Sequence, residues 1–82
     1  MELLKSLRAA ELNEEGLKLI DNGNYEEAIK CFEKAKEIDP RNMDSYINLG
    51  IAYASQESFD KAYEEFQGWF NTRDEKVLYS IV

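Results

Sequence analysis

The chain repeats itself at a fixed offset of 34 residues, and this repetition limits the possible folds more than any other feature. Gly16 and Gly50 are separated by this distance, and so are Phe32 and Phe66. The same offset joins Leu12 to Tyr46, Leu19 to Tyr53, Tyr25 to Phe59 and Ala28 to Ala62. The matching positions span two successive apolar stripes, which indicates that the repeated unit is a pair of secondary-structure elements.

Apolar residues recur at helical spacing throughout the chain, and no segment shows the strict alternation of a half-buried strand. The spacing predicts five helices, at about residues 2–22, 25–39, 43–55, 59–70 and 73–82. The expected helix ends are marked by Gly23, Pro40 and the stretch SQES, and the expected N-caps are Asn24, Asn42, Ser58 and Thr72. The stretch NTRDE is expected to be a short connection before the last helix. We therefore expect an all-α domain with tight turns.

At the repeated positions the chain resembles the tetratricopeptide repeat (TPR) family. The first unit supplies Leu12, Gly16, Leu19, Ala28, Phe32, Ala35 and Pro40, and the second supplies Tyr46, Leu49, Gly50, Tyr53, Ala62 and Phe66. The resemblance implies tandem antiparallel helix-turn-helix repeats that form a short right-handed superhelix, an α-solenoid. It implies one domain over residues 1–82, with repeat one at about 9–42, repeat two at about 43–76 and a C-terminal helix at about 73–82.

The repeated glycines are expected to allow close helix contact, with Ala28 and Ala62 on the opposing helices and Phe32 and Phe66 between the pairs. We also expect Phe59, together with Tyr53, to lie in the core of the second pair.

The second unit departs from the pattern near its end. Trp69 stands where the first unit has Ala35, and Asp74 stands where it has Pro40. A tryptophan does not fit a tight helix contact made on alanine. We therefore expect a different junction after the second unit, with Trp69 covered by residues from the set Val77, Leu78 and Ile81.

Composition excludes several function classes. The net charge of −7 argues against nucleic acid and anionic membranes as partners. The absence of histidine and the single cysteine, Cys31, argue against catalysis, a metal site or a cofactor. The neighbouring Lys30 raises the alternative of a reactive thiol, although an ordinary half-exposed cysteine is the simpler interpretation. We expect a cytoplasmic protein without a membrane span.

The resemblance implies a concave groove lined by the first helix of each pair. The groove residues expected from it are Asn13, Leu17, Ile20, Asp21, Asp44, Ile47, Asn48, Ile51, Ala54 and Ser55. Their aliphatic members would form an apolar strip of the kind that binds amphipathic helices. The alternatives are that this strip is covered by the N-terminal Leu3, Leu4 and Leu7, by the last helix, or by a second copy of the chain.

One subclass of the family binds chaperone C-terminal carboxylates through lysine, arginine and asparagine side chains. The corresponding positions here are Asn13, Leu17, Asn48, Leu78 and Val82. Only Asn48 matches, and carboxylate recognition needs the missing cations. We therefore expect that the chain does not bind a chaperone tail.

The leading functional hypothesis is a non-catalytic protein-interaction module that binds a peptide or an amphipathic helix of an unidentified partner. The first alternative is a scaffold that acts as a homodimer through an apolar C-terminal surface, because two repeats alone form a small array. The residues expected in that surface are Trp69, Val77, Leu78, Tyr79, Ile81 and Val82. The second alternative is a fragment of a longer TPR array.

Overall fold

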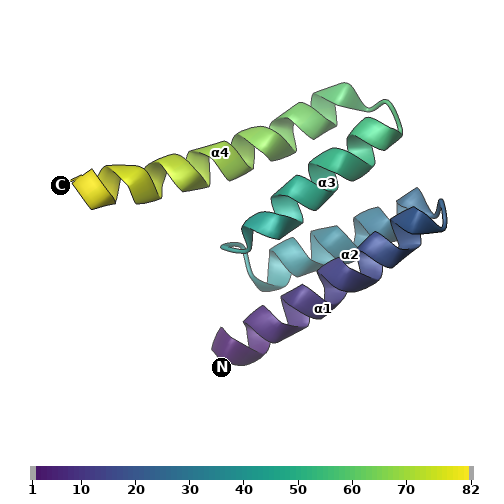
Figure 1. The fold of residues 1–82 in the computed structure, drawn as a ribbon, viewed down its shortest axis with the longest axis horizontal. Helices are drawn as coiled ribbons and strands as arrows, with labels where there is room; N and C mark the ends of the chain where they lie inside the picture. Colours follow the sequence, from purple (N-terminus) through teal and green to yellow (C-terminus); the bar gives the residue numbers. More distant parts are fainter. Residues whose placement is uncertain (1, 82) are drawn as a thin grey trace.

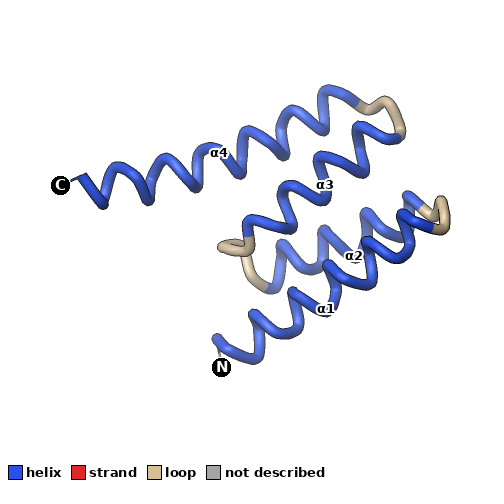
Figure 2. The backbone as a smooth tube through the Cα atoms, in the orientation of Figure 1, coloured by secondary structure: helices blue, strands red, loops and turns tan. Residues whose placement is uncertain are grey.

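The chain folds into two helix pairs. In the computed structural model, which describes residues 2–81 and the side chains of residues 2–71, the helices are α1 (Glu2–Asp21), α2 (Tyr25–Ile38), α3 (Met43–Ser55) and α4 (Phe59–Ile81). Helix α1 lies antiparallel to α2, helix α3 lies antiparallel to α4, and α2 joins the pairs by packing on α3 (Figures 1 and 2). No strand occurs within residues 2–81. The predicted all-α class and repeated helix pairs are confirmed.

The turn between α1 and α2 depends on Gly23. Its φ of +79° lies in the left-handed region, as expected for a glycine that ends a helix. The amide of Gly23 donates to the carbonyl of Ile20 at 2.9 Å, and the amide of Asn24 donates to that of Leu19 at 2.8 Å. Asn24 is the N-cap residue of α2, as predicted, but its side chain makes no capping hydrogen bond. The backbone carbonyl of Asn24 instead accepts from the amide of Ala28 at 3.0 Å.

The turn between α2 and α3 follows the prediction more closely. Helix α2 ends at Ile38, two residues before Pro40, and the amide of Asp39 donates to the carbonyl of Ala35 at 2.9 Å. The Asn42 side chain accepts a hydrogen bond from the amide of Ser45 at 3.3 Å, so the predicted N-cap is confirmed.

The fourth helix corrects the predicted five-helix arrangement. Helix α4 runs for 23 residues without interruption through the stretch NTRDE, so the predicted connection and the cap at Thr72 are wrong. The physical reason is the absence of glycine and proline after Gly68, which leaves nothing to end the helix. Figure 1 shows the C-terminal half of α4 extending past the end of α3.

The two repeated glycines make the same contact in both pairs. A Cβ added at Gly16 would lie 2.7 Å from Cζ of Phe32, and a Cβ added at Gly50 would lie 2.6 Å from Cζ of Phe66. The close approach was predicted, but it is made by the phenylalanine ring rather than by Ala28 and its counterpart. A side chain at either glycine would therefore displace an aromatic ring.

The core lies where α1, α2 and α3 meet. Two clusters of buried residues form it, one with Ala28, Phe32, Leu49 and Ala52, and one with Ala9, Leu12 and Ala35.

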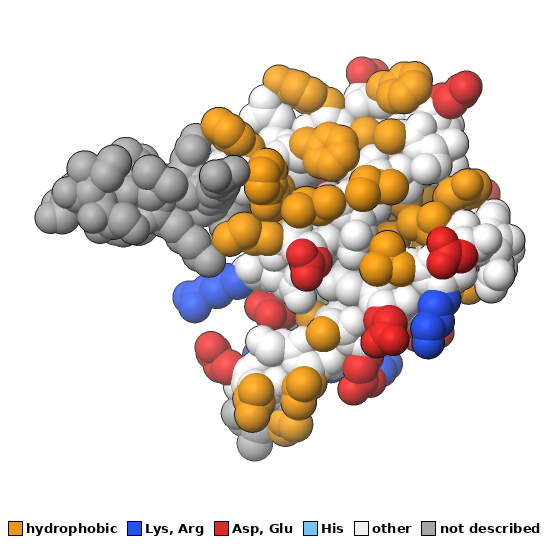
Figure 3. All heavy atoms as spheres, viewed as in Figure 1, with side chains coloured by type: hydrophobic (Ala, Val, Ile, Leu, Met, Phe, Trp, Pro, Cys, Tyr) orange, Lys and Arg blue, Asp and Glu red, His pale blue; other side chains and the backbone are white. Residues whose placement is uncertain are grey.

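The exposed face of α4 differs from the prediction, because Phe59 is 64% exposed instead of buried. Figure 3 shows hydrophobic side chains gathered in a broad patch over α3 and α4, with most of the visible charged side chains toward α1 and α2.

Candidate functional site

A depression lies between α1 and α3, the first helices of the two pairs. It has a volume of about 390 Å³ and is lined by Ala10, Asn13, Glu14 and Leu17 of α1 and by Asp44 and Asn48 of α3. Four of these lining residues belong to the set expected in the groove from the sequence. Because each helix contributes side chains, the depression exists only when the two pairs are stacked.

A buried polar cluster forms the floor of this depression. The amide nitrogen of Asn13 donates to the Ser45 hydroxyl at 3.1 Å, and the amide nitrogen of Asn48 donates to the side-chain oxygen of Asn13 at 3.3 Å. All three residues are buried. Buried polar groups need such partners, so these bonds fix α1 against α3. Asn13 and Asn48 therefore shape the depression and present little of their own surface. Ser45 was not expected in this cluster from the sequence. The one weak indication was its small polar side chain, three residues after the Asn42 cap.

Two aliphatic residues occupy the same position in the two repeats. Leu17 and Ile51 are 34 residues apart, and each is 45% exposed. Matched exposure at matched positions agrees with a strip that continues from one pair to the next. Isolated exposed aliphatic residues are ordinary, but a repeated position on neighbouring helices forms a surface that a partner can contact.

The other expected groove residues are placed less uniformly. Ile20 packs against the core cluster around Phe32, so it is mainly a structural residue. Ile47 and Ala54 are half-buried, and Asp21 and Asp44 are exposed. The Ser55 hydroxyl donates to the carbonyl of Ile51 at 2.9 Å, within its own helix. The exposed aliphatic strip is thus shorter than the sequence predicted.

The N-terminal leucines do not cover this strip. Leu3, Leu4 and Leu7 lie on α1 itself and are 73%, 62% and 52% exposed. Because α1 is one uninterrupted helix, these residues extend it and do not fold back over the groove. The expected last helix is the C-terminal part of α4, which continues as a single helix to Ile81. The side chains of residues 72–82, which were expected as an alternative cover for the strip, lie outside the described residues.

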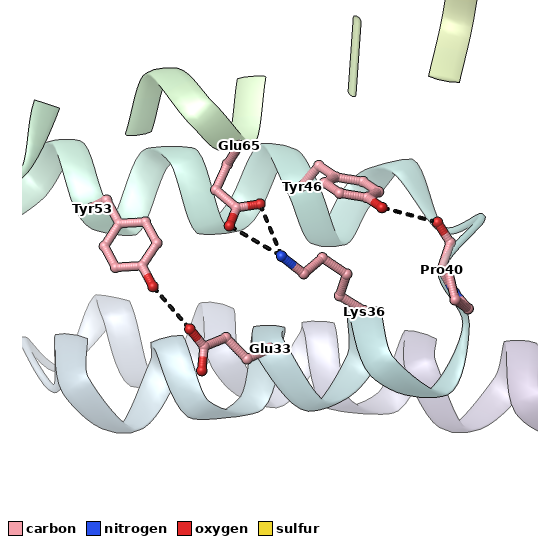
Figure 4. A network of polar contacts seen from close by, with 6 residues as sticks. All are labelled: Glu33, Lys36, Pro40, Tyr46, Tyr53 and Glu65. Carbon is pink, nitrogen blue, oxygen red and sulfur yellow. Dashed lines mark hydrogen bonds and ion pairs between the residues drawn. The ribbon is translucent and has the colours of Figure 1, made fainter. Parts of the chain in front are cut away.

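Polar contacts between α2 and the second pair hold the two units in one orientation (Figure 4). Lys36 of α2 donates to both carboxylate oxygens of Glu65 of α4, at 3.1 and 3.2 Å, and its ammonium lies 5.4 Å from the ring centre of Tyr46. The hydroxyl of Tyr53 donates to Glu33 at 2.9 Å. These contacts were not expected from the sequence, since they join residues 20 and 29 positions apart. They fix α2 of the first pair against α3 and α4 of the second pair.

Two ionisable groups have altered acidity. Burial raises the pKa of Tyr53 to about 12, and the hydrogen bond and the negative charge of Glu33 add to the rise. Burial, with the negative charges of Glu15 and Glu27, raises the pKa of the Cys31 thiol. A raised pKa suppresses the thiolate, which argues against the alternative of a reactive Cys31 activated by lysine.

The depression has an acidic border. Glu14 and Asp44 line it, and its lining contains no lysine or arginine. Lys18 lies 3.8 Å from Glu14 in an exposed ion pair that leaves both side chains more than 70% accessible. The surface therefore combines an aliphatic strip with carboxylates, which favours a ligand that is apolar on one side and cationic at its edges.

The described residues contain neither a cluster suited to a metal ion nor a helix suited to crossing a membrane. Within the described residues, no three side chains from histidine, cysteine, aspartate and glutamate are grouped so that they could hold a metal ion. No helix in the same part of the chain is long and apolar enough to cross a membrane.

Comparison with known proteins agrees with the stacked helix pairs. The family model for the TPR repeat matches residues 16–57, which is just over half of the chain. The chain belongs to the TPR repeat family. The match begins at Gly16 and includes the whole of α2 and α3, so it covers the junction between the two pairs. A TPR domain is typically a non-catalytic protein-interaction module.

One curated relative is a much longer protein that contains a segment similar to part of this chain. The chain is 38% identical over 50 residues to the transcription activator GutR of Bacillus subtilis (strain 168). The aligned segment covers 55% of this chain and 6% of that protein. The chain therefore spans a small part of the relative's length.

Proposed function

We propose that this TPR domain binds an amphipathic helix or peptide of a partner protein in the groove between α1 and α3, without catalysis. The observation that supports this proposal is the depression between α1 and α3, which is lined by Leu17. Ile51, at the matching position of the second repeat, is an aliphatic residue of equal exposure. Helices that bind in grooves insert apolar anchors spaced at three or four residues, and an aliphatic strip receives them. The expected residues of the binding surface are Asn13, Leu17, Ile20, Asp21, Asp44, Ile47, Asn48, Ile51, Ala54 and Ser55.

The charge around the groove defines the partner more closely. Glu14 and Asp44 border the depression, and the chain carries a net charge of −7. A cationic ligand is attracted to such a surface and an anionic one is repelled. We therefore propose a partner segment with leucine-like anchors on one face and lysine or arginine beside them. The same charge argument disfavours an acidic chaperone tail as the partner. In addition, the side-chain amide of Asn48 already donates a hydrogen bond to Asn13.

The direct test uses a displayed library of random 18-residue peptides selected against the whole chain. We expect enriched sequences to carry apolar residues at helical spacing with flanking basic residues. Synthetic peptides from this selection are then titrated by fluorescence anisotropy. Leu17→Asp combined with Ile51→Asp should weaken binding at least tenfold, because both side chains are exposed and contact the ligand directly.

The matched control carries Leu3→Asp and Leu4→Asp, which change two aliphatic residues of comparable or greater exposure away from the groove. This control should bind the selected peptides as the wild type does. Helicity measured by circular dichroism verifies that both variants are folded. Equal binding by the groove variant and the control, or selection of acidic peptides, would contradict the proposal.

Several expectations from the sequence remain proposals. The C-terminal surface expected to mediate self-association includes Val77, Leu78, Tyr79, Ile81 and Val82, whose side chains lie outside the described residues, and Trp69, which is half-buried. The repeat boundaries near residues 42 and 76, a longer TPR array and a cytoplasmic location likewise stay predictions.

A further inference from the structure

A second surface, separate from the groove, lies along α4. Phe59, Tyr63, Phe66 and Phe70 follow one another at intervals of four, three and four residues, which places them on one face of the helix. They are 64%, 64%, 38% and 52% exposed. A cavity of about 460 Å³ opens on this face, lined by Tyr63, Phe66, Gln67, Trp69, Phe70 and Asn71. We call the four exposed aromatic residues the α4 stripe.

The first helix pair shows what such a face is built to contact. Phe32 has the same position in α2 that Phe66 has in α4, and both rings lie against a glycine. Phe32 is fully buried because α3 covers it, with Leu49 and Ala52 in the same cluster. The α4 stripe is therefore a helix-packing face without a covering helix among the described residues.

Helix α1, at the opposite end of the array, is not suited to cover the α4 stripe of a second copy. Leu49 and Ala52, which cover α2, correspond to Glu15 and Lys18 of α1. Both of these residues are exposed and charged, so a head-to-tail stack would place charges against the aromatic stripe. This charge excludes an open chain of copies and leaves a closed contact in which the same face meets itself.

The border of the stripe is compatible with such self-contact despite the acidic net charge. Gln67 and Asn71, which line the cavity beside the aromatic rings, are neutral amides. Glu65 is directed to Lys36 of α2 and is not available for repulsion across a pair. Amide side chains can exchange hydrogen bonds at the rim of an apolar contact.

We propose that the α4 stripe binds the α4 stripe of a second copy of this chain, with the two helices antiparallel about a two-fold axis. The axis passes between Tyr63 and Phe66. Phe59 of one copy then contacts the second copy's Phe70, and Tyr63 contacts the second copy's Phe66. The repeated intervals of three and four residues are those of paired helices, which supports this arrangement.

The exposed area limits how much surface a pair can remove from water. Each large aromatic side chain can bury about 150–250 Å², so the exposed fractions leave roughly 300–550 Å² per copy. A pair would remove about twice this area from water, at the low end of specific interfaces. We therefore expect a reversible dimer with a dissociation constant on the order of 10–100 µM.

The test is sedimentation velocity on the full chain between about 1 and 500 µM, the range around the expected dissociation constant. The wild type should pass from monomer to dimer and no further. Tyr63→Glu combined with Phe70→Glu should remain monomeric throughout, with unchanged helicity. The control Leu3→Glu combined with Leu4→Glu, which also adds two carboxylates at exposed apolar positions, should dimerise as the wild type does.

Isotope-filtered NMR on a mixture of labelled and unlabelled chains tests the orientation independently of any variant. Contacts between the Phe59 ring and the second copy's Phe70 ring are expected. A monomer at all concentrations would overturn the proposal and leave a helix of another protein as the occupant. Growth beyond a dimer, or equal dimerisation by the stripe variant, would also overturn it. The groove variant Leu17→Asp with Ile51→Asp should still dimerise, so the groove and stripe proposals can fail separately.

Discussion

The two helix pairs share one plan but differ in how much of it is completed. In both pairs a phenylalanine ring lies on a glycine of the preceding helix, at Gly16 and at Gly50. In the first pair that ring belongs to Phe32 and is fully buried, whereas in the second it belongs to Phe66 and is 38% exposed. The difference arises because α3 packs on α2, while nothing in the described residues packs on the corresponding face of α4.

This comparison shows that a repeat is not a self-sufficient unit. Each pair forms its own glycine–phenylalanine contact, but the second helix is completed only by the pair that follows it. The second helix of the first pair is therefore completed by packing on α3, whereas the second helix of the second pair carries the exposed α4 stripe. Substitutions at equivalent positions should separate these two contributions.

The largest difference is expected for Phe32→Ala and Phe66→Ala. Removing the buried ring of Phe32 should lower the free energy of unfolding by about 3–5 kcal/mol, because it leaves a cavity among α1, α2 and α3. Removing Phe66 should cost about 1–2 kcal/mol, because more than a third of this residue already contacts water. Urea unfolding followed by circular dichroism at 5 µM protein or below measures both values under conditions where the proposed dimer is dissociated.

Equal losses for the two variants would show that the two pairs are equally complete, which would contradict the comparison. Repeating the measurement near 300 µM sharpens it. If the α4 stripe pairs with a second copy, Phe66→Ala becomes more costly at the higher concentration, while Phe32→Ala keeps its value.

The second difference concerns the two glycines. A methyl group added at Gly16 would meet Cδ1 of Phe32 at 2.8 Å, and the same distance separates a methyl group at Gly50 from Cδ1 of Phe66. The buried ring of Phe32 has no space to move, so Gly16→Ala should destabilise by about 1–3 kcal/mol. The ring of Phe66 can turn toward water, and the better helix propensity of alanine offsets the remaining strain.

We therefore expect Gly50→Ala to lie within about 0.5 kcal/mol of the wild type in the same urea experiment. Destabilisation of the same size at both positions would mean that the second ring is held as firmly as the first. That outcome would remove the physical basis for treating the second pair as incomplete.

The repeat could be predicted from the sequence because its determinants are local and appear twice. The apolar spacing predicted α1, α2 and α3 to within about two residues. The glycine positions predicted a close approach, although a ring fills it where an alanine was expected. The continuation of α4 through NTRDE was missed, because an N-cap residue at Thr72 carries less weight than the absence of any glycine or proline after Gly68.

The candidate site was predicted less completely. Repeat spacing placed Leu17 and Ile51 correctly on exposed, equivalent positions. It could not show that Asn13 and Asn48 are buried against Ser45, since those bonds connect α1 to α3 and depend on the packing of the pairs. The exposure of Phe59 was missed for the same reason, because a signature aromatic is buried only when a further helix covers it.

The third difference lies in the turns. Gly23 and Glu57 occupy equivalent positions, and both have left-handed backbone conformations, with φ of +79° and +62°. A side chain in this region costs roughly 1–2 kcal/mol, so the second turn is strained and the first is not. Gly23→Ala should destabilise by about 1 kcal/mol, although a Cβ there has open space around it.

Glu57→Gly should stabilise the protein by about 0.5 kcal/mol, because relief of strain exceeds the added flexibility of the unfolded chain. Urea midpoints measured at one protein concentration check both variants. A loss of stability on Glu57→Gly would indicate that the glutamate side chain makes a favourable contact that outweighs the backbone strain.

The smallest difference is a pH dependence carried by one tyrosine. Leu19 and Tyr53 are equivalent positions, but only Tyr53 has a hydroxyl, which donates to Glu33 across the junction between the pairs. Its pKa is raised to about 12 in the folded protein, from a value near 10 when unfolded. The unfolded chain therefore loses this proton first as the pH rises.

The Tyr53 contribution to stability is fully present below about pH 10 and is lost as the pH rises from 10 toward 12. Urea midpoints of the wild type should therefore fall more steeply between pH 9 and 11 than those of Tyr53→Phe, which cannot ionise there. The remaining tyrosines titrate in both proteins, so the difference between the two slopes isolates this hydroxyl. Parallel slopes would mean that the contact with Glu33 does not hold the Tyr53 proton more firmly in the folded protein than in the unfolded chain.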